Sequence, residues 1–235
     1  MSILTIIILG LAPSIIWLLF FLRKDTHPES NKMILKIFFY GMLITIPAAL
    51  IEIGIAIFLD KLNISPILIL FLYWFIGVAL IEEFLKYLIV REKVLNNSEF
   101  DEPVDAMLYM IIVALGFAAL ENILVLLPTG KFFLETLGIS ALRFIGATFL
   151  HALCSATLGY FLALSLFETK KRLRLIITGL TIATLLHGIY NFSIIKIADN
   201  SYYIFITIIL LIGLACFVSF GFKKLKKTAS ICKIK

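Results

Sequence analysis

Long apolar stretches separated by short polar segments make up most of this chain. They cover residues 2–22, a run that ends at Leu59, and then 66–91, 104–127, 137–167, 173–196 and 202–222. An α-helix rises 1.5 Å per residue, so roughly 20 apolar residues cross a hydrocarbon core about 30 Å thick. The pattern therefore predicts an all-α, polytopic membrane protein with about seven transmembrane helices.

Composition indicates the same class of protein. Hydrophobic residues make up 62% of the 235 residues and charged residues only 15%, whereas about a quarter of the residues in a soluble domain are charged. The polar connections are too short to hold an extramembrane domain, so we expect a single transmembrane domain over residues 1–235. The net charge of +6 does not indicate nucleic-acid binding, because the basic residues gather at the ends of the apolar runs.

The basic residues also predict an orientation. Lysine and arginine are frequent after the first, third, fifth and seventh runs, whereas the connections after the second, fourth and sixth hold one lysine each when Lys196, at the end of the sixth run, is counted. Basic connections stay on the cytoplasmic side of a membrane. We therefore expect the N-terminus outside and the C-terminus in the cytoplasm.

Polar side chains interrupt the third to sixth runs. They include Glu82, Glu83, Lys86, Glu121, His151, His187 and Asn191. An ionisable side chain in a bilayer costs about 2.5–3.5 kcal/mol on insertion, so such groups usually face a protein interior and mark function. The helical rise places Glu82, His151 and His187 within roughly 10 Å of the bilayer midplane, and we expect the four runs to form one buried hydrolytic site.

The residue types permit two hydrolytic mechanisms. Two imidazoles with a carboxylate form the ligand set of a hydrolytic zinc site, in which a further carboxylate acts as general base on water. Without a metal, a glutamate and a histidine can activate water while a histidine and an asparagine hold the oxyanion. The same residues also suit a proton-coupled transporter or a noncatalytic scaffold that binds partner helices.

The same residues can also have purely structural roles. Glu82 and Lys86, four residues apart, can form an ion pair on one helix face, and Glu83 points about 100° away from that pair. Intramembrane histidines often hydrogen-bond neighbouring helices, and Asn122 can be a packing amide. Two histidines at matched depth beside carboxylates favour the hydrolytic site.

Five motifs together resemble a known family. They are Glu82-Glu83-x-x-Lys86, Glu102-Pro103-Val104-Asp105 with Tyr109, the segment 115–122 that ends in Glu121-Asn122, His151-Ala152 with Gly159, and His187-Gly188-x-x-Asn191-Phe192. In this order they resemble the PrsW family of bacterial intramembrane proteases, distant relatives of the CAAX prenyl proteases. The likeness covers about 82–192 and implies a protease core over about 66–196.

The resemblance implies a peptidase of the bacterial cytoplasmic membrane. Such a protein would make a site-1-type cut in a membrane-spanning anti-sigma factor within the lipid bilayer and so activate a sigma-factor stress response. The implied catalytic residues are Glu82 and Glu83, which contain the general base, and Asn191, which supports His187 or the oxyanion. Glu121, His151 and His187 are implied as ligands of a zinc ion or as polarising groups, and Lys86, Asn122 and Asp105 as supporting residues. The CAAX relatives commonly have histidine at the position of Glu121.

Overall fold

The computed structural model describes residues 2–24, 28–129 and 132–228, and every regular element in these ranges is helical. The elements are α1 (Ile3–Leu22), α2 (Asn31–Asp60), α3 (Pro66–Leu72), the π-helical η1 (Tyr73–Leu80), α4 (Ile81–Lys93), α5 (Pro103–Leu126), η2 (Leu127–Thr129), α6 (Phe133–Ile145), α7 (Ala147–Phe167), η3 (Thr169–Lys171), α8 (Arg172–Lys196) and α9 (Tyr203–Leu225). They form seven helical stretches long and apolar enough to cross a membrane. The predicted all-α fold with seven spans is confirmed.

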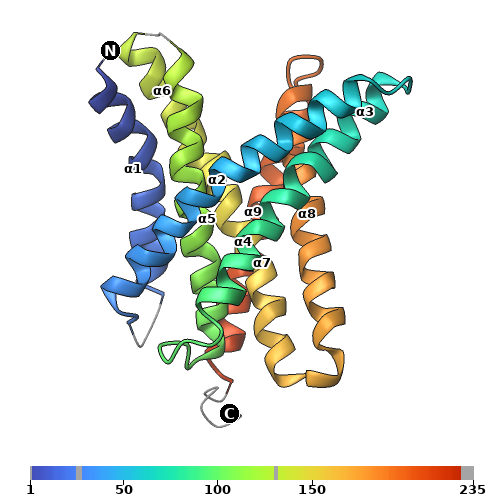
Figure 1. Cartoon of the computed structure of the whole chain (residues 1–235). Coiled ribbons are helices and arrows are strands. Elements are labelled where there is room, and N and C mark those ends of the chain that lie inside the picture. Colours follow the sequence, from blue (N-terminus) through green and yellow to red (C-terminus); the bar gives the residue numbers. More distant parts are fainter. Residues whose placement is uncertain (1, 25–27, 130–131, 229–235) are drawn as a thin grey trace.

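Helix α5 lies at the centre of the bundle (Figure 1), where it packs against α1, α2, α4 and α7. Every residue from Pro103 to Ala119 is buried, because a helix that is apolar on all faces has no side suited to water. By contrast, α1, α2 and α9 present large exposed isoleucine, leucine and phenylalanine side chains. These outer faces are suited to contact lipid.

Glycines let neighbouring helices approach α5 at backbone distance. A Cβ atom added to Gly116 would lie 2.0 Å from the carbonyl oxygen of Phe38 on α2, and one added to Gly41 would lie 2.1 Å from that of Val113 on α5. Gly159 of α7 meets the α5 backbone in the same way. Close packing through small residues is a main source of helix association in membranes.

Two spans depart from a plain α-helix. The third contains the π-helical turn η1 directly before Glu82 and Glu83, and π turns inside helices are frequent at functional sites. The fifth, predicted as one run over 137–167, is broken at Gly146 into α6 and α7. A Cβ atom at this position would lie 2.3 Å from the hydroxyl oxygen of Tyr190, so glycine is required where the two helices meet α8.

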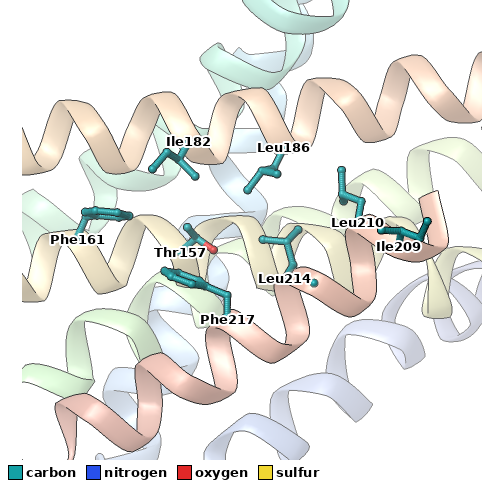
Figure 2. A pocket seen from close by; sticks show the side chains of 9 residues that line it. Thr157, Phe161, Ile182, Leu186, Ile209, Leu210, Leu214 and Phe217 are labelled. Atoms are coloured by element: carbon teal, nitrogen blue, oxygen red, sulfur yellow. The ribbon is translucent and has the colours of Figure 1, made fainter. Parts of the chain in front are cut away.

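An apolar pocket of about 320 Å³ opens between α7, α8 and α9 (Figure 2). Its lining includes Thr157, Phe161, Leu186 and Leu214. None of the polar residues predicted to form the site lines this pocket. The predicted polar site therefore lies elsewhere in the bundle.

Candidate active site

The first part of the site lies within α4, where Lys86 binds two carboxylates. Its Nζ atom lies 3.2 Å from Oε2 of Glu82 and 2.8 Å from Oε1 of Glu83. All three side chains are buried, and Lys86 is 0% exposed. The expectation that Glu83 stands outside the ion pair is wrong, because residues three apart on a helix are neighbours as well as residues four apart.

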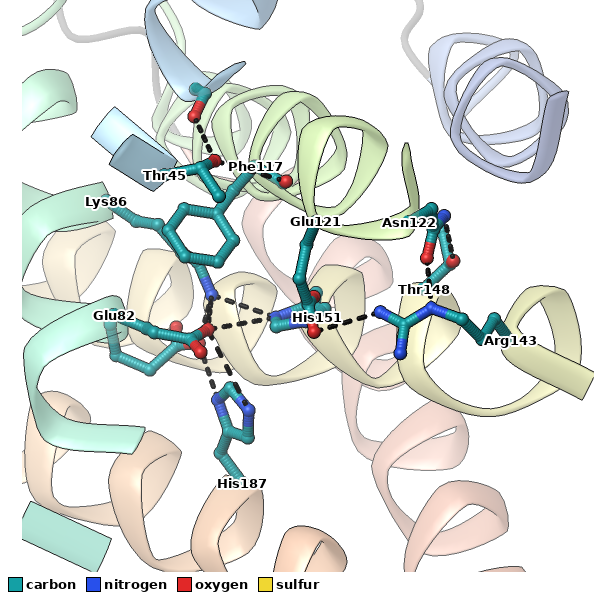
Figure 3. A network of polar contacts seen from close by, with 12 residues as sticks. Thr45, Glu82, Lys86, Phe117, Glu121, Asn122, Arg143, Thr148, His151 and His187 are labelled. Carbon is teal, nitrogen blue, oxygen red and sulfur yellow. Dashed lines mark hydrogen bonds and ion pairs between the residues drawn. The ribbon is translucent and has the colours of Figure 1, made fainter. Parts of the chain in front are cut away.

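Two histidines from other helices approach this ion-paired group (Figure 3). His151 of α7 places Nδ1 at 2.9 Å from Nζ of Lys86 and 3.5 Å from Oε2 of Glu82. His187 of α8 places Nδ1 at 3.1 Å from Oε1 of Glu83 and Nε2 at 4.0 Å from Oε2 of Glu82. The two imidazole rings meet edge to face, with centroids 4.9 Å apart.

The close approach of α8 depends on the glycine that follows His187. A Cβ atom added to Gly188 would lie 2.5 Å from the ring of Phe75, which belongs to η1. The absent side chain leaves room for that ring, so α8 can pack against η1 and bring His187 to the carboxylates at the start of α4. The His-Gly pair therefore has a packing reason as well as a chemical one.

Glu121 of α5 lies on the other side of the His151 ring. Its Oε2 atom is 2.7 Å from Nε2 of His151, and its Oε1 atom is 2.9 Å from Nη2 of Arg143 on α6. The Nε atom of Arg143 donates to Oδ1 of Asn122, and Nδ2 of Asn122 donates to Oγ1 of Thr148 at 3.0 Å. A continuous polar network thus runs from α6 to the carboxylates of α4 (Figure 3).

Four residues of this network could hold a metal ion. Glu82, Glu83, His151 and His187 each offer a ligand atom, and these atoms lie within 4.8 Å of one another. Carboxylate and imidazole donors suit zinc and similar divalent ions. The ammonium of Lys86 already lies 2.8–3.2 Å from the ligand atoms of Glu82, Glu83 and His151. The surroundings therefore favour a positive charge, and the four ligand atoms fit a metal ion.

The expected ligand set shares His151 and His187 with this group, but this group contains Glu82 and Glu83 and does not contain Glu121. Glu121 was expected to join His151 and His187, but it binds Nε2 of His151, whereas the carboxylates of α4 lie near Nδ1. The two nitrogens of one imidazole point in different directions. An ion beside Glu82 and Glu83 would therefore meet Nδ1 of His151, with Glu121 bound to the other nitrogen.

Asn191 and Asp105 lie apart from this group. Asn191 is half-buried on α8, one turn beyond His187, and no hydrogen bond within the described ranges joins it to the four-residue group. Asp105 accepts hydrogen bonds from the backbone of Asp101 and Glu102 and so caps the start of α5. Helical rise places it about 24 Å along the axis from Glu121, so its role here is structural.

Two side chains of the site were not predicted from the sequence. Arg143 lies eight residues before His151, and Ser155 lies four residues after it and donates to Oε2 of Glu83 at 2.6 Å. Residues four and eight apart recur on one face of a helix, so treating the fifth span as a single helix places Arg143, His151 and Ser155 on the same side. A charged residue inside an apolar run was itself a sufficient signal for Arg143.

Comparison with known proteins gives a consistent result. The family described as PrsW family intramembrane metalloprotease matches residues 29–216. Protease PrsW of Geobacillus kaustophilus is 34% identical over 195 residues, which cover 83% of this chain and 81% of the relative. Protease PrsW of Bacillus subtilis is 32% identical over 228 residues, which cover 96% of each chain. No solved structure shows significant similarity to the chain.

These similarities extend over most of this chain and most of each relative. The matched residues 29–216 include α4 to α8, the helices whose side chains form the polar network. The relatives are named as proteases, and the seven apolar stretches are those of a multi-pass protein of a bacterial membrane. The peptidase prediction is confirmed, and the findings give no support to the transporter and scaffold alternatives. The chain belongs to the PrsW family of intramembrane metalloproteases.

Proposed function

We propose that this peptidase makes a site-1-type cut in a membrane-anchored anti-sigma factor and so starts a sigma-factor stress response. One observation supports hydrolysis inside the membrane more than any other. Buried carboxylate and imidazole atoms from α4, α7 and α8 lie within 4.8 Å of one another. The resemblance of the five motifs to the PrsW family supports the choice of substrate.

Glu82 is the proposed general base. Both oxygens of Glu83 already accept hydrogen bonds, from Lys86, Ser155 and His187, so Glu83 is less suited to take a proton from water. Glu82 binds through Oε2 only, and its Oε1 atom has no hydrogen-bond partner among the described residues. That free oxygen can accept a proton from a water molecule, which is the task of a general base in peptide hydrolysis.

The proposed metal ligands are Glu83, His151 and His187, and zinc is the proposed ion. Three protein ligands leave one position open, as catalytic zinc sites require. When bound, the ion would polarise the scissile carbonyl and acidify water. The network contains three carboxylates but only two cations, Lys86 and Arg143. A bound metal ion would therefore also offset the remaining buried negative charge. We assign the support of the oxyanion to the amide of Asn191, because Asn191 lies one helical turn beyond His187 on α8.

The function is tested by reconstituting the purified chain in liposomes with candidate anti-sigma factors and detecting cleavage by mass spectrometry. We expect Glu82→Gln to lower the cleavage rate by about 10²–10⁴-fold, the range for a lost general base. Glu92→Gln is the matched control, because Glu92 lies on the same helix but is exposed and pairs with Arg91. Near-normal cleavage by Glu82→Gln would exclude Glu82 as the base.

Elemental analysis tests the metal separately. We expect about one zinc-like ion per chain, absent from His187→Ala together with activity. Glu121→Gln should keep the ion if Glu121 only orients His151, whereas a ligand role predicts its loss. A cleavage rate that is unchanged after exhaustive dialysis against a strong chelator would favour the metal-free mechanism instead.

A further inference from the structure

Arg143 is the one cation of the polar network that no motif contains. It lies on α6, three residues before the break at Gly146, and its side chain is 17% exposed. A guanidinium at this depth needs partners, and it has two from α5. Its Nε atom binds Asn122 and its Nη2 atom binds Glu121, so the planar group spans two consecutive side chains.

Asn122 is itself fixed by two further helices. Its Nδ2 atom donates to the carbonyl oxygen of Gly10 on α1 at 3.2 Å and to Oγ1 of Thr148 on α7 at 3.0 Å. Its Oδ1 atom is thereby turned toward Arg143. The orientation of the guanidinium is therefore set by α1, α5 and α7 together, which makes it a rigid support and not a solvated charge.

Glu121 transmits this orientation to His151. One of its oxygens binds Arg143 and the other lies 2.7 Å from Nε2 of His151. A carboxylate only accepts hydrogen bonds, so Nε2 carries the proton and the lone pair of the ring is on Nδ1. Nδ1 is the atom that faces Lys86 and Glu82. Partners of this kind commonly fix the tautomer of a metal-binding histidine.

We propose that Arg143 is a positioning residue, which acts through Glu121 to hold His151 with Nδ1 directed at the catalytic group. The proposal rests on the proposed function, because it assumes that His151 takes part in hydrolysis. Arg143 itself lies across the His151 ring from the reacting groups and touches none of them. Its effect is on the orientation of the ring, and a residue that only stabilised the fold would leave that orientation unchanged.

Kinetics provide the first test. We expect Arg143→Ala to lower kcat by about 10–100-fold, as for other lost partners of ligating groups, with little change in KM. Added guanidinium should restore part of the loss, because Arg143 and Glu121 are 17% and 29% exposed. Arg143→Lys should be intermediate, since a lysine cannot reproduce the planar fork. Arg174→Ala removes the same charge from an exposed position and should behave as wild type.

Nitrogen NMR of ¹⁵N-histidine-labelled protein gives a readout that needs no substrate. The chain has three histidines, so single substitutions assign the signals. We expect His151 to be protonated on Nε2 in the wild type and to lose this fixed tautomer in Arg143→Ala. Unchanged His151 signals and unchanged kcat would overturn the proposal. If Arg143→Ala does not fold, wild-type signals and kcat in Arg143→Lys would do so.

The two proposals fail in distinguishable ways. A wild-type protein that cleaves no membrane substrate contradicts the proposed function, yet the NMR comparison still decides whether Arg143 orients His151. Conversely, a wild type that cleaves normally and an Arg143→Ala variant with wild-type signals and kcat would leave the peptidase intact and exclude the positioning role.

Discussion

Replacing Lys86 by methionine should destabilise the protein strongly. Methionine preserves much of the length of the side chain but removes the charge that Glu82 and Glu83 share at 3.2 and 2.8 Å. Both carboxylates are at most 4% exposed, so water cannot replace the ammonium. Breaking a buried pair by removing one partner costs about 3–5 kcal/mol, and the lost contact of Nζ with the ring of Phe117, now 4.5 Å away, adds to it.

Unfolding in mild detergent by added SDS, followed through tryptophan fluorescence, measures this cost. Lys93→Met is the control on the same helix, and an exposed lysine should lose no more than about 1 kcal/mol. The double variant Lys86→Met/Glu83→Gln should recover more than about 1 kcal/mol, because coupled sites are non-additive. A Lys86→Met variant within about 1 kcal/mol of wild type, or no recovery in the double variant, would refute the argument.

Two further predictions concern the bundle as a whole. Gly116→Ala should cost about 1–3 kcal/mol, because its Cβ would meet the Phe38 carbonyl and overpack the helix crossing, whereas Gly213→Ala, with nothing within 4 Å, should be neutral or slightly stabilising in the same SDS titration. Reporter fusions after about residue 130 should report the outer side and those after about residue 170 the cytoplasm; the opposite pattern would reverse the orientation.

The spans were predictable because hydropathy alone decides which segments cross a bilayer. The meeting of Glu82, His151 and His187 was also predictable, since helical rise gave them a common depth and buried charge needs partners. The depth of a residue in the membrane does not determine in which direction its side chain points around the helix axis. For that reason the sequence could not indicate that Glu121 binds Nε2 of His151 while the carboxylates of α4 lie near Nδ1.

The irregular parts of the fold were harder to predict. No rule for apolar runs identifies the π turn Tyr73–Leu80, because its residues are apolar like those around them. The break at Gly146 arises from tertiary packing against Tyr190, so the glycine alone, in the middle of an apolar run, was not a sufficient signal. Arg143 was visible in the sequence, but its partners lie on α5, and contacts between helices cannot be read from one span.

The position of Lys86 also has a consequence for biosynthesis. Its two carboxylate partners lie on the same helix, one turn before it, so both ion pairs can form as soon as α4 has left the ribosome. Glu121 instead pairs with Arg143 on the following span. Chains are made from the N-terminus, and an unpaired charge in lipid is costly. We therefore expect the third span to enter the bilayer with Lys86 already paired and one net negative charge left, whereas Glu121 of the fourth span gains its partner only when the fifth span is made.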